Sequence, residues 1–400
     1  MKIGIYQSYW GRVGGGQRYV GVVAQVLARG HDVEIVHYAE DFDRGAIEEA
    51  LELDLSGVGF RQVPRPQHPQ WPTGNPLARL RLERDWCREL SSPYDVFIDS
   101  SDTPPFFCHA SKGVLLTHFP LMTFEEFHGH HTEAWRRRPL PVRWMASWFH
   151  RLEWRQRLAT YGLFLVNSHF TQRWIRRLWG VRAKVVYPPL RPGLRPAEKE
   201  PLVVTIGAFH HAQHKKHDVL IEAYKQLCDA GLAGWRYVLV GAAGPADEDR
   251  RYVQQLRAAA GAYPIEIRTD VDGGQLRGLL GRASLLWHSM GYGVDAERQP
   301  RRMEHFGMVA TEAMAAGCVP IVFRGGGLPE IVSHARNGFL WSTLEELKAT
   351  TRQAAGDPPL LRSLAAAAVA RSRDFGDEAF EARLLEALGP VVPQDQRSGV

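Results

Sequence analysis

Cysteine is scarce in this sequence, and its few copies stand far apart, at positions 87, 108, 228 and 318. No two of them have the short spacing of a disulfide framework or of a cysteine-based zinc site, so the sequence excludes both. Long apolar runs are also missing, because nothing approaches the roughly 18 consecutive apolar residues of a membrane-spanning helix. The first residues, MKIGIYQSYWG, lack the features of a signal peptide, so we expect a cytoplasmic protein.

Net charge is small for a chain of this size. The 49 Lys and Arg residues exceed the 44 Asp and Glu residues by only five over 400 residues. A nucleic-acid-binding protein usually concentrates far more basic charge over a whole domain, so we expect no nucleic-acid partner. The chain is 44% hydrophobic, which is enough to build ordinary cores. Its length predicts two domains, and three domains are the less favoured alternative.

The first half of the chain repeats a strand-and-helix pattern. An apolar strand at 3–6 leads to a loop at Gly14–Gly16, and residues 20–27 have apolar positions at helical spacing. HDVEIVHY (31–38) is the next strand, which completes a β-loop-α-β unit of the kind that builds parallel sheets. Further short apolar strands are predicted at 94–101, 112–119, 163–168 and 183–188.

The pattern restarts after a short linker. We place an N-terminal Rossmann-like domain over 1–190, a linker over 191–200 and a C-terminal Rossmann-like domain over 201–375. A helix at 376–390 is predicted to pack back on the N-terminal domain, and 391–400 to form a tail. The fold class is therefore α/β, with two parallel-sheet domains facing a cleft. Ligands of such sheets bind beyond the carboxyl ends of the strands.

Three loops at predicted strand ends carry residues suited to chemistry. GRVGGGQR (11–18) precedes a helix, where glycines allow close backbone approach and the helix N-terminus favours anions. Tyr19 stands where a dinucleotide fingerprint would have its third glycine, so this spacing disfavours a dehydrogenase. A tight turn is the alternative interpretation of these glycines.

The second loop, HHAQHKKH (210–217), is strongly cationic. Lys215 and Lys216 are placed to neutralise a phosphate, and a solvated polar loop is the alternative. A metal site built from the four histidines is less favoured, because no nearby acidic residue completes it.

The third segment, EHFGMVATEAMAAGCVPIVFRGGGLPEIV (304–332), joins two carboxylates to a helix start. Glu304 precedes a helical run and Glu312 lies inside it. The amides of Phe306, Gly307 and Met308 would form the free N-terminus of that helix. Carboxylates that accept from hydroxyls, beside amides that donate to oxygens, suit a polyhydroxyl ligand that carries phosphate.

These motifs resemble family 4 of the retaining GT-B glycosyltransferases, and the resemblance covers nearly the whole chain. The 304–340 stretch, which includes GGGLPEIV and NGFLW, is its most specific part. The arrangement of WHSMGYG before EHFG is most similar to a branch of envelope-polysaccharide and lipid-linked oligosaccharide mannosyltransferases. Other matching pieces are HFP (118–120), NSHFT (167–171), YPP (187–189) and HKKHDVLIEAY (214–224).

The resemblance implies a role for each matching residue that binds the donor. Glu312 would hold the ribose hydroxyls of a nucleoside diphosphate sugar, and Glu304 with the amides of 306–308 would hold the sugar. Lys215 would bind the diphosphate, with Lys216 beside it.

On the N-terminal side, the resemblance implies that Gly15 and Gly16 close over the diphosphate and that His118 lies beside the reacting face of the sugar. Together with the donor-binding residues, these positions form the site that the sequence predicts.

One position departs from the family pattern. The family usually has Gly-Arg at the end of the first strand of the second domain, where this sequence has Gly207-Ala208. We expect Lys216 or a histidine (His210, His211 or His214) to supply the missing positive charge, because the loop is unusually cationic.

The expected activity is transfer of a hexose from GDP-mannose or a UDP-sugar to a glycan or lipid-linked acceptor, with retention implied by the family. No cofactor or metal is expected, because a lysine and helix N-termini can stabilise the leaving diphosphate. His118, Lys215 and Glu304 are the predicted catalytic group. The alternative is a catalytically idle sugar-nucleotide-binding or membrane-scaffold protein on the same fold, which the missing arginine favours.

Residues 131–185 hold 12 Lys and Arg against two Glu, and six of the 12 tryptophans. Arginine mixed with tryptophan at helical spacing is typical of a helix that lies on an anionic membrane. A core helix with solvated arginines and an acceptor groove for a soluble anion are equally open alternatives. The residues singled out for the acceptor or membrane side are His128, Arg137, Trp144 and Trp148.

Overall fold

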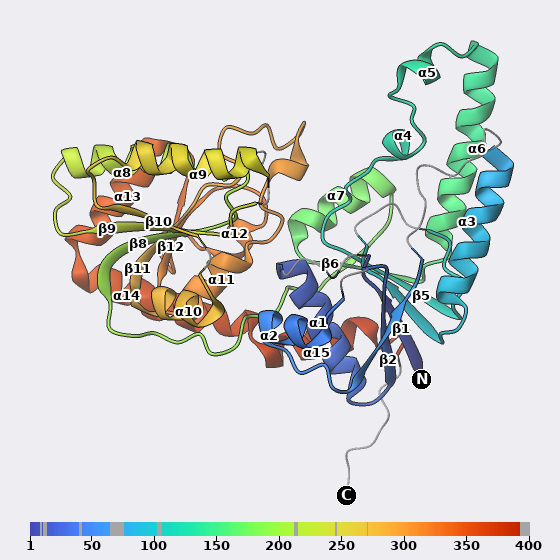
Figure 1. Ribbon diagram of the computed structural model, residues 1–400, viewed down its shortest axis with the longest axis horizontal. Coiled ribbons are helices and arrows are strands. Elements are labelled where there is room, and N and C mark those ends of the chain that lie inside the picture. The colour runs from blue at the N-terminus through green and yellow to red at the C-terminus, as the bar shows by residue number, and fades with distance from the viewer. Residues whose placement is uncertain are drawn as a thin grey trace, which may run out of the picture. The chain divides into compact units, whose positions relative to one another are not determined.

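The computed structural model describes residues 1–8, 10, 14–39, 42–64, 76–101, 106–211, 215–244, 246–269 and 271–392. The chain forms two compact units (Figure 1). The first combines Met1–Pro189 with Phe380–Val400, and the second is the continuous stretch Leu190–Ala379.

The first unit is built on a seven-stranded parallel sheet in the order β3-β2-β1-β4-β5-β6-β7. Its central strands are short apolar runs, as buried parallel strands require, and Ile5 of the first strand pairs with Ile35 and Ile98 on its two sides. The strands are β1 (Lys2–Tyr6), β2 (Asp32–His37), β3 (Val58–Gln62), β4 (Val96–Asp99), β5 (Lys112–Thr117), β6 (Leu163–Val166) and β7 (Lys184–Val185).

Helices connect these strands, and three of them form a projection from the first unit. In Figure 1, α4, α5 and the first half of α6 rise away from the sheet. Side-chain caps fix several helix starts: Thr123 and Glu126 form a capping box on α4, and Ser168 caps α7, which ends at Gly180. The helices are α1 (Gly15–Ala28), α2 (Arg44–Leu51), α3 (Pro76–Ser91), α4 (Phe124–Phe127), α5 (Glu133–Arg136), α6 (Leu140–Ala159) and α7 (His169–Trp179).

The last helix, α15 (Asp377–Leu388), belongs to the core of the first unit. Its buried residues Phe380, Leu384 and Leu388 pack in the same cluster as Ile3 and Tyr19 near the start of the chain. Lys184 donates a hydrogen bond to the carbonyl of Ala387, at 3.2 Å. The polypeptide therefore returns to its first unit after completing the second.

The second unit is a six-stranded parallel sheet in the order β10-β9-β8-β11-β12-β13. Its central strand β8 is buried at Leu202, Val203 and Val204 and has β9 and β11 as neighbours. The strands are β8 (Glu200–Ile206), β9 (Arg236–Val240), β10 (Ile265–Arg268), β11 (Ala283–His288), β12 (Val319–Phe323) and β13 (Phe339–Trp341).

Two of the helices that cover this sheet, α8 and α9, lie side by side on one face (Figure 1). The helices of the unit are α8 (His217–Asp229), α9 (Asp247–Ala260), α10 (Gly273–Arg282), α11 (Met308–Ala315), α12 (Leu328–Ile331), α13 (Leu344–Gly356) and α14 (Pro358–Ser372). Two short 3₁₀ turns occupy Pro300–Arg302 and Arg373–Phe375.

The predicted fold class, α/β with two Rossmann-like parallel-sheet domains, is confirmed. One local prediction is wrong: Gly15 and Gly16 are not in a loop, because they form the first turn of α1 after Gly14 as N-cap. Glycine is a poor helix former, and packing of the buried apolar face of this helix overrides that preference.

Candidate active site

Three side chains from neighbouring parts of the second sheet meet beyond the carboxyl ends of its strands. Lys215 lies in the connection from β8 to α8, and His288 is the last residue of β11, which pairs with β8. Glu304 lies just before α11, which follows β11 along the chain. Because parallel strands end at the same edge of a sheet, this topology brings together residues that are up to 89 positions apart in the sequence.

The carboxylate of Glu304 is the centre of this group. Its Oε2 atom accepts a hydrogen bond from Lys215 Nζ at 3.1 Å and lies 2.9 Å from His288 Nε2. The hydroxyl of Ser289 donates to the carbonyl of Lys215 at 2.6 Å, which fixes the backbone that carries the lysine. The residue that follows β11 thus holds the backbone of the lysine in place.

Electrostatics keep this carboxylate ionised. Burial alone would raise the pKa of Glu304, but attraction to Lys215 and the hydrogen bond from His288 hold its pKa well below the usual range. Burial lowers the pKa of His288 despite the opposing effect of Glu304. The cluster is therefore a carboxylate whose Oε2 atom contacts both the ammonium group of Lys215 and the buried imidazole of His288.

Glycines allow the backbone around Glu304 to pack closely. Gly326 has a φ of 63°, and a Cβ there would collide with the carbonyl of Glu304. The amide of Gly327 donates to that same carbonyl at 2.8 Å. Gly307, with a φ of 115°, is the N-cap of α11, and a side chain there would press on Leu328. The glycine-rich segment is thus required by the position of Glu304.

The start of α11 lies next to this cluster, and Glu312 is buried in the same helix. The predicted donor amides at 306–308 therefore stand where a helix has amides without intrahelical partners. Arg191, from the stretch predicted as linker, lies 3.6 Å from Glu312 through its Nε atom. Phe306 is buried and packs edge-on against Phe375, at 5.6 Å between ring centroids.

The next residue of the cationic loop has an unusual backbone. Lys216 is the N-cap of α8 with a φ of 54°, in the left-handed region that non-glycine residues rarely adopt. His217, the first residue of that helix, is buried. The strained backbone of Lys216 thus lies between Lys215 of the cluster and the buried His217.

The structure contradicts the prediction that the histidines of this loop have no acidic residue nearby. Asp249 of α9 places its Oδ1 atom 2.9 Å from His211 Nδ1 and 3.5 Å from His210 Nδ1. Helix α9 follows β9, the neighbour of β8, and this sheet order brings the aspartate to the loop. His214 falls outside the described residues.

In the first unit, His118 directly follows β5 and so stands at the carboxyl edge of that sheet. Its ring packs edge-on against Tyr19 at 5.6 Å, and its carbonyl accepts a hydrogen bond from Thr171. The Cβ position of Gly16 would lie 3.5 Å from His118 Nε2. Two of the predicted N-terminal site residues, Gly16 and His118, are therefore neighbours.

Predicted acceptor-side residues fall into two different environments. His128 follows α4 and stacks on His150 of α6, with ring centroids 4.2 Å apart. Arg137 is exposed and pairs with Glu133 at 2.5 Å. Trp144 and Trp148 have 77% and 62% of their surface exposed.

The other tryptophans of the basic segment are structural. Trp135, Trp154, Trp174 and Trp179 are buried, so the core interpretation holds for these four rings. The exposed large apolar side chains of α6 are confined to its outer part, from Leu140 to Leu152. The surface proposed to contact a membrane is therefore reduced from residues 131–185 to residues 140–152 of α6.

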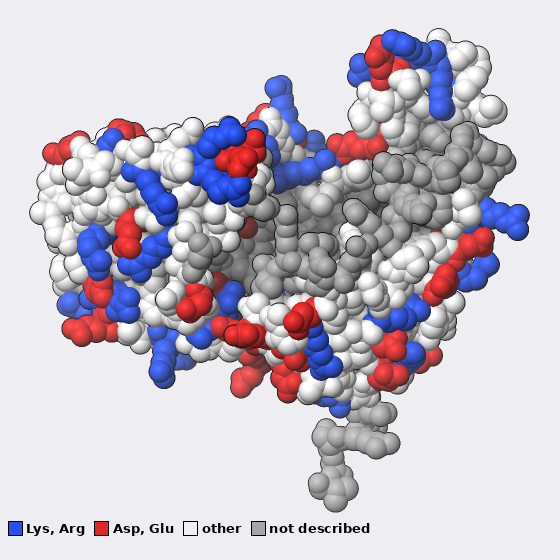
Figure 2. Space-filling model, in the orientation of Figure 1, with Lys and Arg blue, Asp and Glu red and all other residues white. Residues whose placement is uncertain are grey.

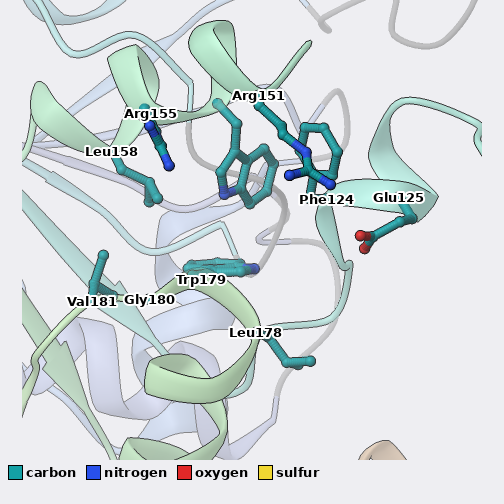
Figure 3. Close-up of a pocket in the computed structure, with 10 residues that line it drawn as sticks. Phe124, Glu125, Arg151, Arg155, Leu158, Leu178, Trp179, Gly180 and Val181 are labelled. Carbon is teal, nitrogen blue, oxygen red and sulfur yellow. The ribbon is translucent and has the colours of Figure 1, made fainter. Parts of the chain in front are cut away.

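A pocket of about 510 Å³ lies between α4, α6 and α7 in the first unit. Figure 3 shows Arg151 and Arg155 extending from α6, across from the ring of Trp179 in α7. Glu125 stands at one side, so the rim carries both signs of charge. Aromatic walls with arginines at the rim are suited to a sugar or phosphate group.

Among the described residues, no helix is both long enough and apolar enough to span a bilayer.

Sequence reasoning missed His288, Ser289 and Arg191 as members of the site. WHSMGYG contained the first two, but only the pairing of β11 with β8 shows that they face Lys215. Arg191 was hidden because its proline-rich surroundings are typical of a linker.

Comparison with known families agrees with this fold. Residues 13–192 match the family described as Glycosyltransferase Family 4, and residues 188–371 match the family described as Glycosyl transferases group 1. The chain belongs to the family 4 glycosyltransferases of GT-B fold.

Several curated relatives share one name, that of a GDP-mannose-dependent mannosyltransferase. The chain is 27% identical to GDP-Man:Man(3)GlcNAc(2)-PP-Dol alpha-1,2-mannosyltransferase of Dictyostelium discoideum, over 59% of this chain and 48% of the relative. The chain thus spans about half the length of the curated relatives of this kind that it matches.

Solved structures share the fold at low identity. Anabaena HepE in complex with UDP-glucose aligns over 98% of this chain and 100% of its own, with a TM-score of 0.67 and 18% identity. Sucrose-phosphate synthase from Thermosynechococcus elongatus aligns over 98% of both chains, with a TM-score of 0.66 and 16% identity.

Proposed function

We propose that this glycosyltransferase moves a mannosyl residue from GDP-mannose to a glycan or lipid-linked acceptor, with retention of anomeric configuration and without a metal ion. The observation that carries the proposal is the Lys215–Glu304–His288 cluster beside the start of α11. The Dictyostelium relative is named for a GDP-mannose donor and a dolichyl-diphosphate acceptor, which favours these substrates over a UDP-hexose. A UDP-sugar donor, as in the HepE complex, is the second candidate.

Transfer breaks the bond between the anomeric carbon and the diphosphate oxygen, so negative charge develops on the leaving group. Lys215 supplies a fixed positive charge for that oxygen, and the amides at the start of α11 add aligned dipoles. The acceptor hydroxyl forms the new bond and loses its proton, which the departing phosphate accepts in a front-face reaction. Lys215 therefore acts on the bond that breaks.

Glu304 is assigned to binding. Its carboxylate is already held by Lys215 and His288, and it is ionised at neutral pH, so it is suited to accept hydrogen bonds from sugar hydroxyls. Glu312 would accept from the ribose hydroxyls, and Arg191 beside it would neutralise its charge. In the first unit, Gly15, Gly16 and His118 would contact the diphosphate and sugar.

Lys216 is assigned to the positive charge that Ala208 does not supply. His210 and His211 are turned toward Asp249, which leaves Lys216 as the better-placed described candidate. If Lys216 supplies this charge, Ala208→Arg should change donor affinity little, as measured by calorimetric titration with GDP-mannose, and a sharp rise would show that the site lacks a cation. Unchanged affinity would show that the loop already supplies enough charge.

On the acceptor side, we propose that the outer part of α6 rests on an anionic membrane. Trp144, Met145, Trp148 and Leu152 are exposed and recur at helical spacing. A groove of about 720 Å³ runs between the tryptophans and Arg143 and Arg151. Figure 2 shows Lys and Arg side chains at the tip of this projection, with acidic atoms among them and uncharged atoms beside them. Apolar side chains ringed by arginine suit insertion among anionic head groups.

The transfer mechanism is tested with Lys215→Ala, assayed for mannose transfer from GDP-mannose. Turnover should fall by about 100-fold or more, because a preorganised charge at the leaving group is a large catalytic contribution. Lys225→Ala on α8 is the matched control and should retain activity, and EDTA should leave the wild-type rate unchanged. Near-normal turnover of Lys215→Ala would refute the assignment. Absence of both transfer and donor hydrolysis in the wild type would favour the idle sugar-nucleotide-binding alternative.

Donor choice is tested by thermal shift with GDP, UDP and ADP. A ligand that binds only the folded chain at 100 times its dissociation constant stabilises it by about 2.7 kcal/mol. GDP should give the largest increase in melting temperature, and a larger increase with UDP would replace GDP-mannose by a UDP-sugar.

Membrane docking is tested by co-sedimentation with vesicles that contain phosphatidylglycerol. The wild type should sediment with these vesicles at low salt and much less with neutral vesicles or at high salt. Trp144→Ala/Trp148→Ala should reduce binding severalfold, while Leu82→Ala, at an exposed leucine of α3, should not. Failure of the wild type to sediment at low salt would refute the membrane proposal.

A further inference from the structure

A second cluster of titratable side chains lies beside the lysine-bearing loop but outside the proposed transfer machinery. His210 and His211 follow β8, and Asp249 stands in the first turn of α9. The backbone of Phe209 forms a bridge with Ala243, which holds the two connections against each other. The cluster is therefore positioned by the pairing of β8 with β9 and not by a single loop.

Its geometry is compact. The Oδ1 atom of Asp249 accepts a hydrogen bond from the backbone amide of His211 at 3.1 Å and lies 2.9 Å from that residue's Nδ1. His210 Nδ1 is 3.5 Å from the same oxygen, and the two imidazole rings are nearly parallel, 5.2 Å apart. One potential ligand atom from each of the three residues lies within 4.8 Å of the others.

Asp249 is the rigid member of the cluster. Its side chain is completely buried, and a Cβ at position 244 would collide with Oδ2, so Gly244 is needed for the carboxylate to sit there. Among the described residues, Oδ2 has no hydrogen-bond partner. A buried carboxylate with one oxygen that lacks a partner among the described residues favours an added cation.

The identity of the three ligands selects the class of cation. Two imidazole nitrogens and one carboxylate oxygen are donors typical of zinc, whereas magnesium and calcium prefer oxygen alone. Ligand atoms of tetrahedral zinc are about 3.3 Å apart, given metal–ligand distances of about 2.0–2.2 Å. The distances from Asp249 Oδ1 to the Nδ1 atoms of His211 and His210 are 2.9 and 3.5 Å, and they bracket that value.

We propose that His210, His211 and Asp249 form a site for a divalent transition-metal ion of the zinc type, with at least one coordination position open to water or another oxygen ligand. The side chains of His210 and His211 are 36% and 48% exposed, so an ion reaches the site from solvent, while Asp249 anchors it from below. The site is independent of the proposed function, because the recorded partners of Glu304 are Lys215 and His288, which lie outside this cluster.

The test is calorimetric titration of the full chain, stripped of metal, with zinc chloride. The expected result is one ion per chain, with affinity lowered about 100-fold or more in Asp249→Asn and about tenfold or more in His211→Gln. His131→Gln, at an exposed histidine of the first unit, is the matched control and should bind zinc as the wild type does. Cobalt should give a visible absorption band in the wild type that both site variants lose.

Two results would overturn the proposal. One is absence of stoichiometric zinc binding to the wild type, and the other is equal binding by the wild type and both site variants. His211→Gln keeps the test decisive if Asp249→Asn unfolds, because His211 is half exposed and its loss disturbs no core. Equal melting temperatures of metal-free wild type and His211→Gln would verify that the fold is intact.

Discussion

The imidazole of His217 is enclosed in the second unit, with 1% of its surface exposed, between Phe209 and Tyr252. Burial, together with the positive charge of Lys215, lowers the pKa of this histidine to about 3. In the unfolded chain its pKa is about 6.5, so between these values the unfolded state binds more protons than the folded state. Stability from this residue is therefore complete above pH 6.5 and falls as the pH decreases toward 3.

We accordingly expect His217 to contribute a loss of about 2 kcal/mol in the free energy of unfolding between pH 7 and pH 5. His217→Gln, which cannot be protonated, should show a loss smaller by about that amount. Urea unfolding of both proteins at the two pH values measures the difference. Equal losses in the two proteins would mean that the histidine is already protonated in the folded state.

At the scale of residues, the residue types suited to a site were easier to predict from the sequence than the contacts between them. Lys215 was selected for its cationic loop, and Glu304 and Glu312 for the helix start and the glycines that follow them. Their roles toward phosphate and sugar stay predictions. Asp249 was missed because it lies 38 positions from His211, and nothing in its local sequence shows that β9 pairs with β8. Residues joined by sheet order alone are hidden from an inspection of one sequence.

Helix α6 changes character along its length. Its outer part exposes tryptophan, while its inner part buries Arg157 between Glu83 of α3 and Glu153 of the same helix. Both carboxylates lie 2.5 Å from the guanidinium group, and the rings of Phe107 and Phe127 cover it. Removal of this cation leaves two buried carboxylates without their partner.

Arg157→Met is therefore expected to lower the free energy of unfolding by about 3–5 kcal/mol. Arg155→Met, two residues away and exposed, is the control and should change stability by less than about 0.5 kcal/mol. Chemical denaturation monitored by tryptophan fluorescence distinguishes them. A similar small effect in both variants would show that the buried ion pairs are not needed to anchor α6.

The sequence pattern predicted elements best where apolar runs were short and bounded. The strands of both sheets follow such runs, as in KGVLLT for β5 and ASLLWH for β11. The basic stretch was harder, because six tryptophans among arginines suit a membrane face and a core equally well. Burial of four of these rings depends on the packing of α5, α6 and α7, which hydrophobic spacing alone does not specify.

The whole molecule is two sheets joined by a chain that passes from the first unit to the second and back again. The return is made by α15, whose Leu384 is completely buried in the core of the first unit. Leu384→Ala should destabilise that unit by about 2–5 kcal/mol, because it leaves a cavity in a packed core. Glu386→Ala, exposed on the same helix, should be nearly neutral.

Hydrogen exchange separates this effect by unit. Amides of β1 should exchange faster in Leu384→Ala than in the wild type, while those of β8 should keep their protection. Equally faster exchange in β8 would show that the two units unfold as one.

The route of the chain also sets an order for events on the ribosome. The second unit is continuous, so all of its strands are available once residue 379 has been made. The first unit begins earlier but lacks Phe380, Leu384 and Leu388 until these residues have been made. During synthesis, the oldest part of the polypeptide therefore waits with an uncovered apolar surface while the younger part completes its fold, and protection by a chaperone is most needed in that interval.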